Sequence, residues 1–402
     1  MSRVRHFARD VREQIKGFFL NGVYFLFLST LFSPNVLAVE EKHTAWETTK
    51  RRQKTEIDNF LLQDPKQASL PQSPIAIELY NDAVTYYQSR DYDLAEEALK
   101  EAMSYDPRNP FAPQLMGDLY YLKHDLALAK EYYKKAYLLH PDEMLKEKIE
   151  KINREIPLES KFSTLGEETE GEKFILKYQN ERNLTDVSGV GVMSPGDMKK
   201  ILNESYQVLS DDFGHAIRGS LIVLLYDPEE FRTILDVPHW IGGLNDGKVR
   251  LPAYGRNMNQ DGARSLVLHE MTHSFVHSMS GGRGHAPEWL NEGLAVYQEG
   301  KMRPRDLIVL KAAIITGTLF PLDRLMAEGI DQFEEDPLLV SLFYEQSFHV
   351  VDFLIKKYGM FKLKELVAQF KERKTSEEAL TQVIGLRIDQ LEALWKNTLT
   401  AE

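Results

Sequence analysis

The spacing of apolar and polar residues predicts helices in the first and last parts of the chain and strands between them. Three segments have strand-like patterns: 173–178, 221–226 and 248–253. Pro195, followed closely by Asp197, begins a predicted helix that runs to about Asp212. From Gly262 onward, almost every segment has helical periodicity. Strands followed by helices predict an α+β domain with a small sheet, which we place at residues 173–402.

The N-terminus has the pattern of a secretory signal peptide. Basic residues occupy the first positions: Arg3, Arg5, Arg9, Arg12 and Lys16. An apolar run over 18–32 follows, and Val36-Leu37-Ala38 then offers a cleavage site after Ala38. Residues 1–38 are therefore a predicted signal peptide, and we expect a periplasmic or extracellular protein with no stable membrane span after cleavage. An uncleaved signal anchor is the alternative. The polar residues 39–74 are a predicted linker.

Residues 75–156 contain an internal repeat. Seven pairs of similar residues are each 34 positions apart: Ala83 and Gly117, Tyr86 and Tyr120, Tyr87 and Tyr121, Leu94 and Leu128, Ala95 and Ala129, Ala102 and Ala136, and Pro107 and Pro141. This is the period of the tetratricopeptide repeat, a helix–turn–helix unit. The charged segment 142–156 is a predicted capping helix, and the acidic residues 157–172 are a predicted linker. The module either packs on the rest of the chain or binds a protein partner, and the sequence leaves both open.

Composition excludes some functions. The chain has 402 residues, a formal net charge of −12 and no cysteine. The absence of cysteine excludes disulfides, thiolate metal sites and a cysteine nucleophile. The acidic balance argues against nucleic acid as a partner.

One helical segment, 264–277, contains the pattern His-Glu-x-x-His. His269 and His273 are four residues apart, so their imidazoles lie one turn apart on one helix face and can reach one metal ion. The neighbouring Glu270 does not reach the metal, but it can face a water molecule bound there. Eighteen residues separate His273 from Glu292, which lies on a second predicted helix and completes a His₂Glu site with an open position. We therefore predict one Zn²⁺ per chain, with Glu270 as general base.

Both halves of this pattern resemble the gluzincin metallopeptidases, as does the phrase Trp289-Leu290-Asn291-Glu292-Gly293-Leu294-Ala295. The bacterial peptidase-MA-like domain, which often follows tetratricopeptide repeats, is the most similar member. The resemblance implies that Tyr344 stabilises the oxyanion and that Glu299 orients a histidine ligand, although an ordinary helix-surface glutamate fits Glu299 equally. It also implies that residues 248–253 form an edge strand, which pairs with an extended substrate. The Gly-x-Met-Glu-Asn phrase of the aminopeptidases is absent from the region before His269, which favours an endopeptidase or a narrowly specific peptidase over an exopeptidase.

Several functional questions stay open at this point. The main prediction is an exported zinc peptidase that hydrolyses peptide or protein substrates. The alternatives are a repeat-containing scaffold with a weakly catalytic or inactive peptidase-like domain, and hydrolysis of a non-peptide amide. The sequence assigns no definite role to His239, His277 or His285, although His277 is too far along its helix to share the ion with His269.

Overall fold

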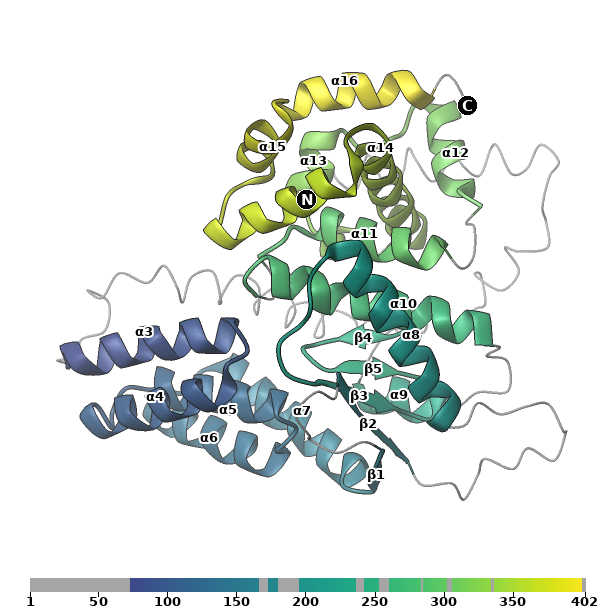
Figure 1. Ribbon diagram of the computed structural model, residues 1–402. Coiled ribbons are helices and arrows are strands. Elements are labelled where there is room, and N and C mark those ends of the chain that lie inside the picture. Colours follow the sequence, from purple (N-terminus) through teal and green to yellow (C-terminus); the bar gives the residue numbers. More distant parts are fainter. Residues whose placement is uncertain are drawn as a thin grey trace, which may run out of the picture. The chain divides into compact units, whose positions relative to one another are not determined.

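The computed structural model describes residues 73–165, 173–179, 195–235, 242–252, 260–282, 285–301, 306–333 and 336–399. Within these ranges the chain is mostly helical, with a small mixed sheet, which agrees with the predicted α+β class (Figure 1). The described residues fall into two compact units, one up to Gly282 and the other from His285 onward. The predicted signal peptide and all but the last two residues of the predicted linker 39–74 lie outside the described residues.

The first unit begins with paired helices. They are α3 (Pro74–Gln88), α4 (Tyr92–Tyr105), α5 (Phe111–Leu122), α6 (Leu126–Leu139) and α7 (Glu143–Glu159). Helix α3 packs on α4, α5 on α6, and α6 on α7. The small residues of the predicted repeat are buried in these contacts: Ala83, Ala95, Ala102, Gly117, Ala129 and Ala136. Small side chains allow helix axes to approach closely. The helices agree with the predicted periodicity, and their assignment to the tetratricopeptide class stays a prediction.

One repeat position requires glycine. A Cβ atom on Gly117 would lie 2.4 Å from Cδ1 of Tyr133, whose ring is buried and whose hydroxyl donates to Asp118 at 2.6 Å. The equivalent positions one repeat earlier are Ala83 and Leu99, which lie in one buried cluster. The earlier repeat therefore combines the smaller Leu99 with an alanine, and the later repeat combines the larger Tyr133 with a glycine.

The sheet has five described strands, namely β1 (Phe162–Leu165), β2 (Phe174–Gln179), β3 (Leu221–Leu225), β4 (Leu244–Asn245) and β5 (Val249–Leu251). Their order is β1-β2-β3-β5-β4. The pairs β2–β3 and β3–β5 are parallel, and the outer pairs β1–β2 and β5–β4 are antiparallel. The three strands predicted from the pattern are confirmed, and their ends differ from the predicted ones by at most two residues. All five residues of β3 are buried, as its uniformly apolar sequence requires.

Two details of this sheet differ from the predictions. Part of the predicted linker 157–172 has regular structure, because residues 157–159 complete α7 and residues 162–165 form β1. The prediction that residues 248–253 form an edge strand is wrong for the described part, because β5 pairs with β3 on one side and β4 on the other. The physical reason is the turn at Gly247, where a φ of +101° folds the chain back so that Leu244 pairs with Arg250.

Helices complete the first unit around this sheet. They are α8 (Pro195–Phe213), α9 (Pro228–Leu235) and α10 (Gln260–Met279). Helix α8 agrees with the helix predicted to begin at Pro195, and it packs along α10. The ring of Phe275 on α10 contacts the rings of Tyr206 and Phe213 on α8, at 5.2 Å and 5.7 Å between centroids. Helix α10 also contacts β4 and β5. It is therefore held on two sides.

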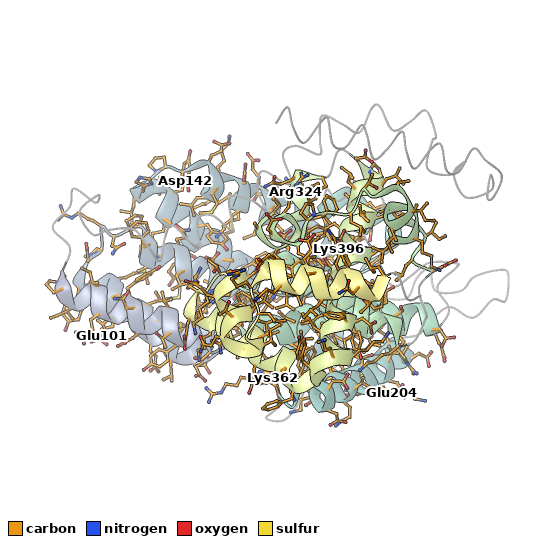
Figure 2. All side chains as sticks on the ribbon, turned by 90° about the horizontal axis from the view of Figure 1, so that it is seen from above. Glu101, Asp142, Glu204, Arg324, Lys362 and Lys396 are labelled. Atoms are coloured by element: carbon orange, nitrogen blue, oxygen red, sulfur yellow. The ribbon has the colours of Figure 1, made fainter. Side chains whose placement is uncertain are left out.

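The second unit is helical in its described residues. It comprises α11 (Glu288–Gly300), α12 (Ile308–Thr316), α13 (Leu322–Ala327), α14 (Pro337–Gln369), α15 (Ser376–Ile384) and α16 (Ile388–Leu399), with short 3₁₀ turns at 330–332 and 370–372. Helix α14 is interrupted at Gly359, whose φ is +83°. Lys362 and Lys396, labelled in Figure 2, form ion pairs with Glu365 and Glu392 at the surface of α14 and α16.

Within the described residues, the segment Pro337–Glu372 is long and apolar enough to cross a membrane by length and composition. Inside the protein, 61% of its most apolar window is buried. Burial of this extent is typical of a core helix in a folded domain.

Candidate metal centre

Helix α10 carries the first two predicted ligands. The ring centroids of His269 and His273 are 5.0 Å apart, with the ring planes at 81°. His273 is buried and His269 is partly exposed. This is the arrangement that a spacing of four residues gives on a helix, where both side chains share one face.

Glu270 lies between these histidines in sequence and is 4% exposed. A glycine makes room for its carboxylate, since a Cβ atom on Gly243 would lie 2.5 Å from Glu270 Oε1. The backbone of Glu270 is also held, because Asn245 Nδ2 donates to the Glu270 carbonyl oxygen at 2.8 Å. Both the side chain and the backbone of Glu270 therefore contact the segment around β4.

The third predicted ligand, Glu292, is on α11 and is 8% exposed. The next residue fixes this helix against α14, because a Cβ atom on Gly293 would lie 2.6 Å from the carbonyl oxygen of Ser347. Trp289, fully buried on the same helix, donates from Nε1 to Ser376 Oγ at 3.1 Å. The Trp-Leu-Asn-Glu-Gly phrase thus packs the helix tightly within its own unit.

His269, His273 and Glu292 form a group that could hold a metal ion. Each offers one ligand atom, and these atoms all lie within 4.8 Å of one another. The donor set fits zinc, which binds imidazole nitrogen and carboxylate oxygen, and three protein ligands leave a fourth position for water or substrate. Two neutral imidazoles and one carboxylate also leave part of the divalent charge uncompensated, which is what polarises a bound oxygen.

The other residues singled out in the sequence have less defined positions. Tyr344 is half-buried on α14, with its ring centroid 6.4 Å from that of Phe343, and Glu299 is half-buried on α11. The ring of His277 stacks parallel to that of His273 at 6.4 Å. His285 is half-buried, and His239 lies outside the described residues. The catalytic role of Tyr344 and the orienting role of Glu299 stay predictions.

Comparison with known proteins supports a peptidase-like domain. Residues 206–401 match the family model of the Peptidase MA superfamily. No curated protein matches the chain. The match begins within α8 and includes His269, Glu270, His273, Glu292 and Tyr344. It supports a peptidase-MA-like, gluzincin-like domain, from a superfamily whose members are typically metal-dependent.

Sequence reasoning missed the residues that hold α10. The Asn245 side chain donates to two groups on that helix, the Glu270 carbonyl and Ser274 Oγ. The Asn-Asp-Gly sequence predicts a turn. Which helix the asparagine side chain faces depends on tertiary packing, and no local signal could have identified it.

Proposed function

We propose that the chain is an exported zinc-dependent peptidase in which His269, His273 and Glu292 bind the metal and Glu270 is the general base. The observation that carries the proposal is the group of three ligand atoms within 4.8 Å, in a segment that matches the Peptidase MA superfamily. The burial of His273, Glu270 and Glu292 supports it, since buried ionisable side chains require charged or polar partners.

The chemistry of each residue follows from its type. When bound, zinc acidifies a water molecule and polarises the substrate carbonyl. Glu270 accepts the proton of the attacking water and passes it to the leaving amine, which a carboxylate can do within hydrogen-bond reach. The Tyr344 hydroxyl is the proposed donor to the oxyanion. The histidines and Glu292 act as ligands and do not exchange protons with substrate.

We assign peptides or proteins outside the cytoplasm as the substrate class. Export rests on the signal-like residues 1–38, and the substrate class rests on the peptidase-like domain. The helices of 75–156 contact the sheet of their own unit, which supports a packing role. A protein partner on these helices would be additional to that role.

Metal content tests the ligand assignment. The purified mature protein is expected to retain about one zinc per chain after dialysis, as a His₂Glu site requires. His269→Ala and His273→Ala should lose it, because two remaining ligands bind zinc weakly. The matched control is His277→Ala, which removes a third histidine from the same helix and should keep the metal. Equal zinc retention in all three variants would show that the assignment is wrong.

Turnover tests the catalytic assignment. Glu270→Gln keeps the size and the polarity of the side chain but removes the base, so the rate of peptide-library cleavage should fall by about 10²- to 10⁴-fold with zinc unchanged. A variant with wild-type turnover would refute the role of Glu270. If the wild-type protein binds zinc but cleaves no member of a peptide library, the scaffold function is favoured instead.

A further inference from the structure

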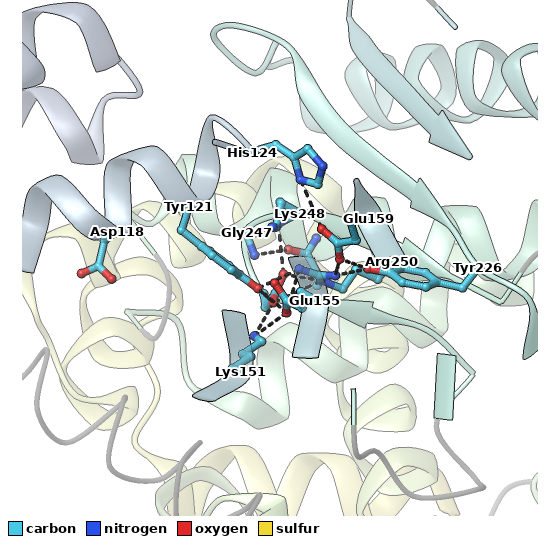
Figure 3. Close-up of polar contacts among 12 residues, drawn as sticks. Asp118, Tyr121, His124, Lys151, Glu155, Glu159, Tyr226, Gly247, Lys248 and Arg250 are labelled. Carbon is cyan, nitrogen blue, oxygen red and sulfur yellow. Dashed lines mark hydrogen bonds and ion pairs between the residues drawn. The ribbon is translucent and has the colours of Figure 1, made fainter. Parts of the chain in front are cut away.

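A buried cluster of charged residues joins the N-terminal helices to the sheet within the first unit (Figure 3). Its cations are Lys151, Lys248 and Arg250, and its anions are Glu155, Glu159 and Asp246. Arg250 and Lys248 are fully buried, as is Glu155. The charges balance, three against three. Five of the six groups form ion pairs within the cluster, and Lys248 Nζ lies over the Tyr121 ring, 3.6 Å from its centroid. Charges inside a protein need partners of this kind.

Arg250, on β5, is the centre of the cluster. Its Nη2 lies 3.2 Å from Glu155 Oε1, its Nη1 pairs with Glu159, and its Nε lies 3.2 Å from Asp246 Oδ1. The phenol of Tyr121, on α5, accepts from Arg250 Nη2 at 2.7 Å. The guanidinium thus contacts groups from α5, α7 and the β4–β5 turn at once, as its fixed fork of donors allows.

Asp246 connects that turn to the helices. Its Oδ2 accepts from the Tyr121 hydroxyl at 2.8 Å and from Lys151 Nζ at 2.6 Å. The next residue, Gly247, also touches α5, because a Cβ atom there would lie 2.3 Å from Leu122 Cδ2. One side of the turn is therefore held by α5 and α7.

The other side of the turn holds α10. Asn245 Nδ2 donates to the Glu270 carbonyl oxygen at 2.8 Å and to Ser274 Oγ at 2.7 Å, while its Oδ1 accepts from the backbone of Gly247 at 3.2 Å. Asn245 and Asp246 are consecutive. Any displacement of Asp246 that α5 or α7 imposes must therefore act on the residue that binds the Glu270 backbone.

We infer that the turn 245–248, which we call the coupling turn, links the position of Glu270 to that of the N-terminal helices. In this link Asp246 contacts α5 and α7, Asn245 contacts α10, and both are positioning residues. The contacts themselves lie within one unit and need no metal. The catalytic consequence rests on the proposed function, because it requires Glu270 to be the base. Positioning matters for a base, since misplacement by about 1 Å can cost on the order of 10²-fold in rate.

Asp246→Asn tests the first link of the coupling turn. It removes the charge on which Tyr121 and Lys151 converge. Asp118→Asn is the matched control, because Asp118 Oδ1 also accepts from one tyrosine, Tyr133 at 2.6 Å, and one lysine, Lys148 at 2.7 Å, both within the N-terminal helices.

The first readout is hydrogen exchange in peptides from α10. Exchange there should rise about threefold in Asp246→Asn and stay at the wild-type rate in Asp118→Asn. Of these two aspartates, only Asp246 is next to Asn245, which binds α10. Cleavage is the second readout. In Asp246→Asn, kcat should fall by about tenfold with KM and zinc content unchanged, because the base is displaced while the ligands remain. Identical α10 exchange in the two variants would overturn the inference.

Asn245→Ala tests the second link, between the coupling turn and α10. If Asp246→Asn does not fold, this variant tests the inference in its place. Its α10 peptides should exchange faster while those of α5 and α7 remain protected, since the change lies between them. If neither Asn245→Ala nor Asp246→Asn alters exchange in α10, the coupling does not exist. Should the wild-type protein cleave no peptide, the proposed function fails, while the exchange measurement still decides the coupling.

Discussion

Glu159→Gln should destabilise the first unit, and the loss should depend on pH. Glu159 is 4% exposed, and its carboxylate pairs with Arg250, accepts from Tyr226 and lies 3.5 Å from His124. Burial raises its pKa, but Arg250, Lys248, His124 and Tyr226 lower the pKa by more, from an ordinary value of 4.5 to about 2. At 1.36 kcal/mol for each pKa unit, ionised Glu159 contributes about 3 kcal/mol to the free energy of unfolding at neutral pH.

The sign of the pH dependence follows from the depressed pKa. Because the pKa of Glu159 is lower in the folded state than in the unfolded chain, its contribution is complete above 4.5 and disappears as the pH falls through 2. Linkage then gives a difference between wild type and Glu159→Gln of about 3 kcal/mol at pH 7 and about 1 kcal/mol at pH 3.

Urea unfolding followed by far-ultraviolet circular dichroism measures this difference. The matched control is Glu143→Gln on the same helix, because Glu143 pairs with Lys146 at 2.9 Å but both side chains are exposed. Solvent screens that exposed pair, so its loss should be much smaller than that of Glu159 at either pH. A loss for Glu159→Gln that is the same at pH 7 and pH 3, or no larger than that of Glu143→Gln, would refute the reasoning.

Two further predictions concern the same unit. Gly117→Ala should cost about 1–3 kcal/mol through overpacking against Tyr133, and adding Tyr133→Leu should recover part of that loss in a double-mutant unfolding cycle. Burial, with Arg250 nearby, lowers the pKa of Lys248 from 10.5 to about 8, so the free energy of unfolding of the wild type should rise by about 2–3 kcal/mol between pH 7 and pH 10. Lys248→Met should lack this rise in urea unfolding at the two pH values, and a parallel rise in both proteins would contradict the assignment.

The parts of the structure that sequence could predict are those set by local patterns. Five consecutive apolar residues predicted β3, and helical periodicity predicted the helix that carries His269 and His273. The ligand group also follows from spacing, because four residues on a helix bring two imidazoles onto one face.

The parts that it could not predict depend on distant residues. Arg250 and Glu159 are 91 positions apart, and no periodicity connects them. The interior position of β5 depends on the two-residue strand β4, which is too short to have a pattern of its own. The C-terminal end of α7 and the strand β1 could not be predicted, because Pro157 indicates a helix break in the sequence but lies inside α7.

The charged cluster is better explained by specificity than by stability. Replacing a buried ion pair with apolar residues of similar volume is often neutral or stabilising, so burying the five charges that accompany the partly exposed Lys151 is a poor way to gain free energy. Apolar contacts between α7 and the sheet already exist, since Leu158 packs with Ile175 and Ile222. Such contacts are non-directional and fix the relative position of helix and strand only loosely. The hydrogen bonds to Asp246 and Arg250 are directional, and they are satisfied in one arrangement of α5, α7 and β5. The proposed base, Glu270 on α10, needs such a fixed arrangement because Asn245 of β4 binds its backbone, and this requirement would account for a cluster whose net gain over apolar residues is small.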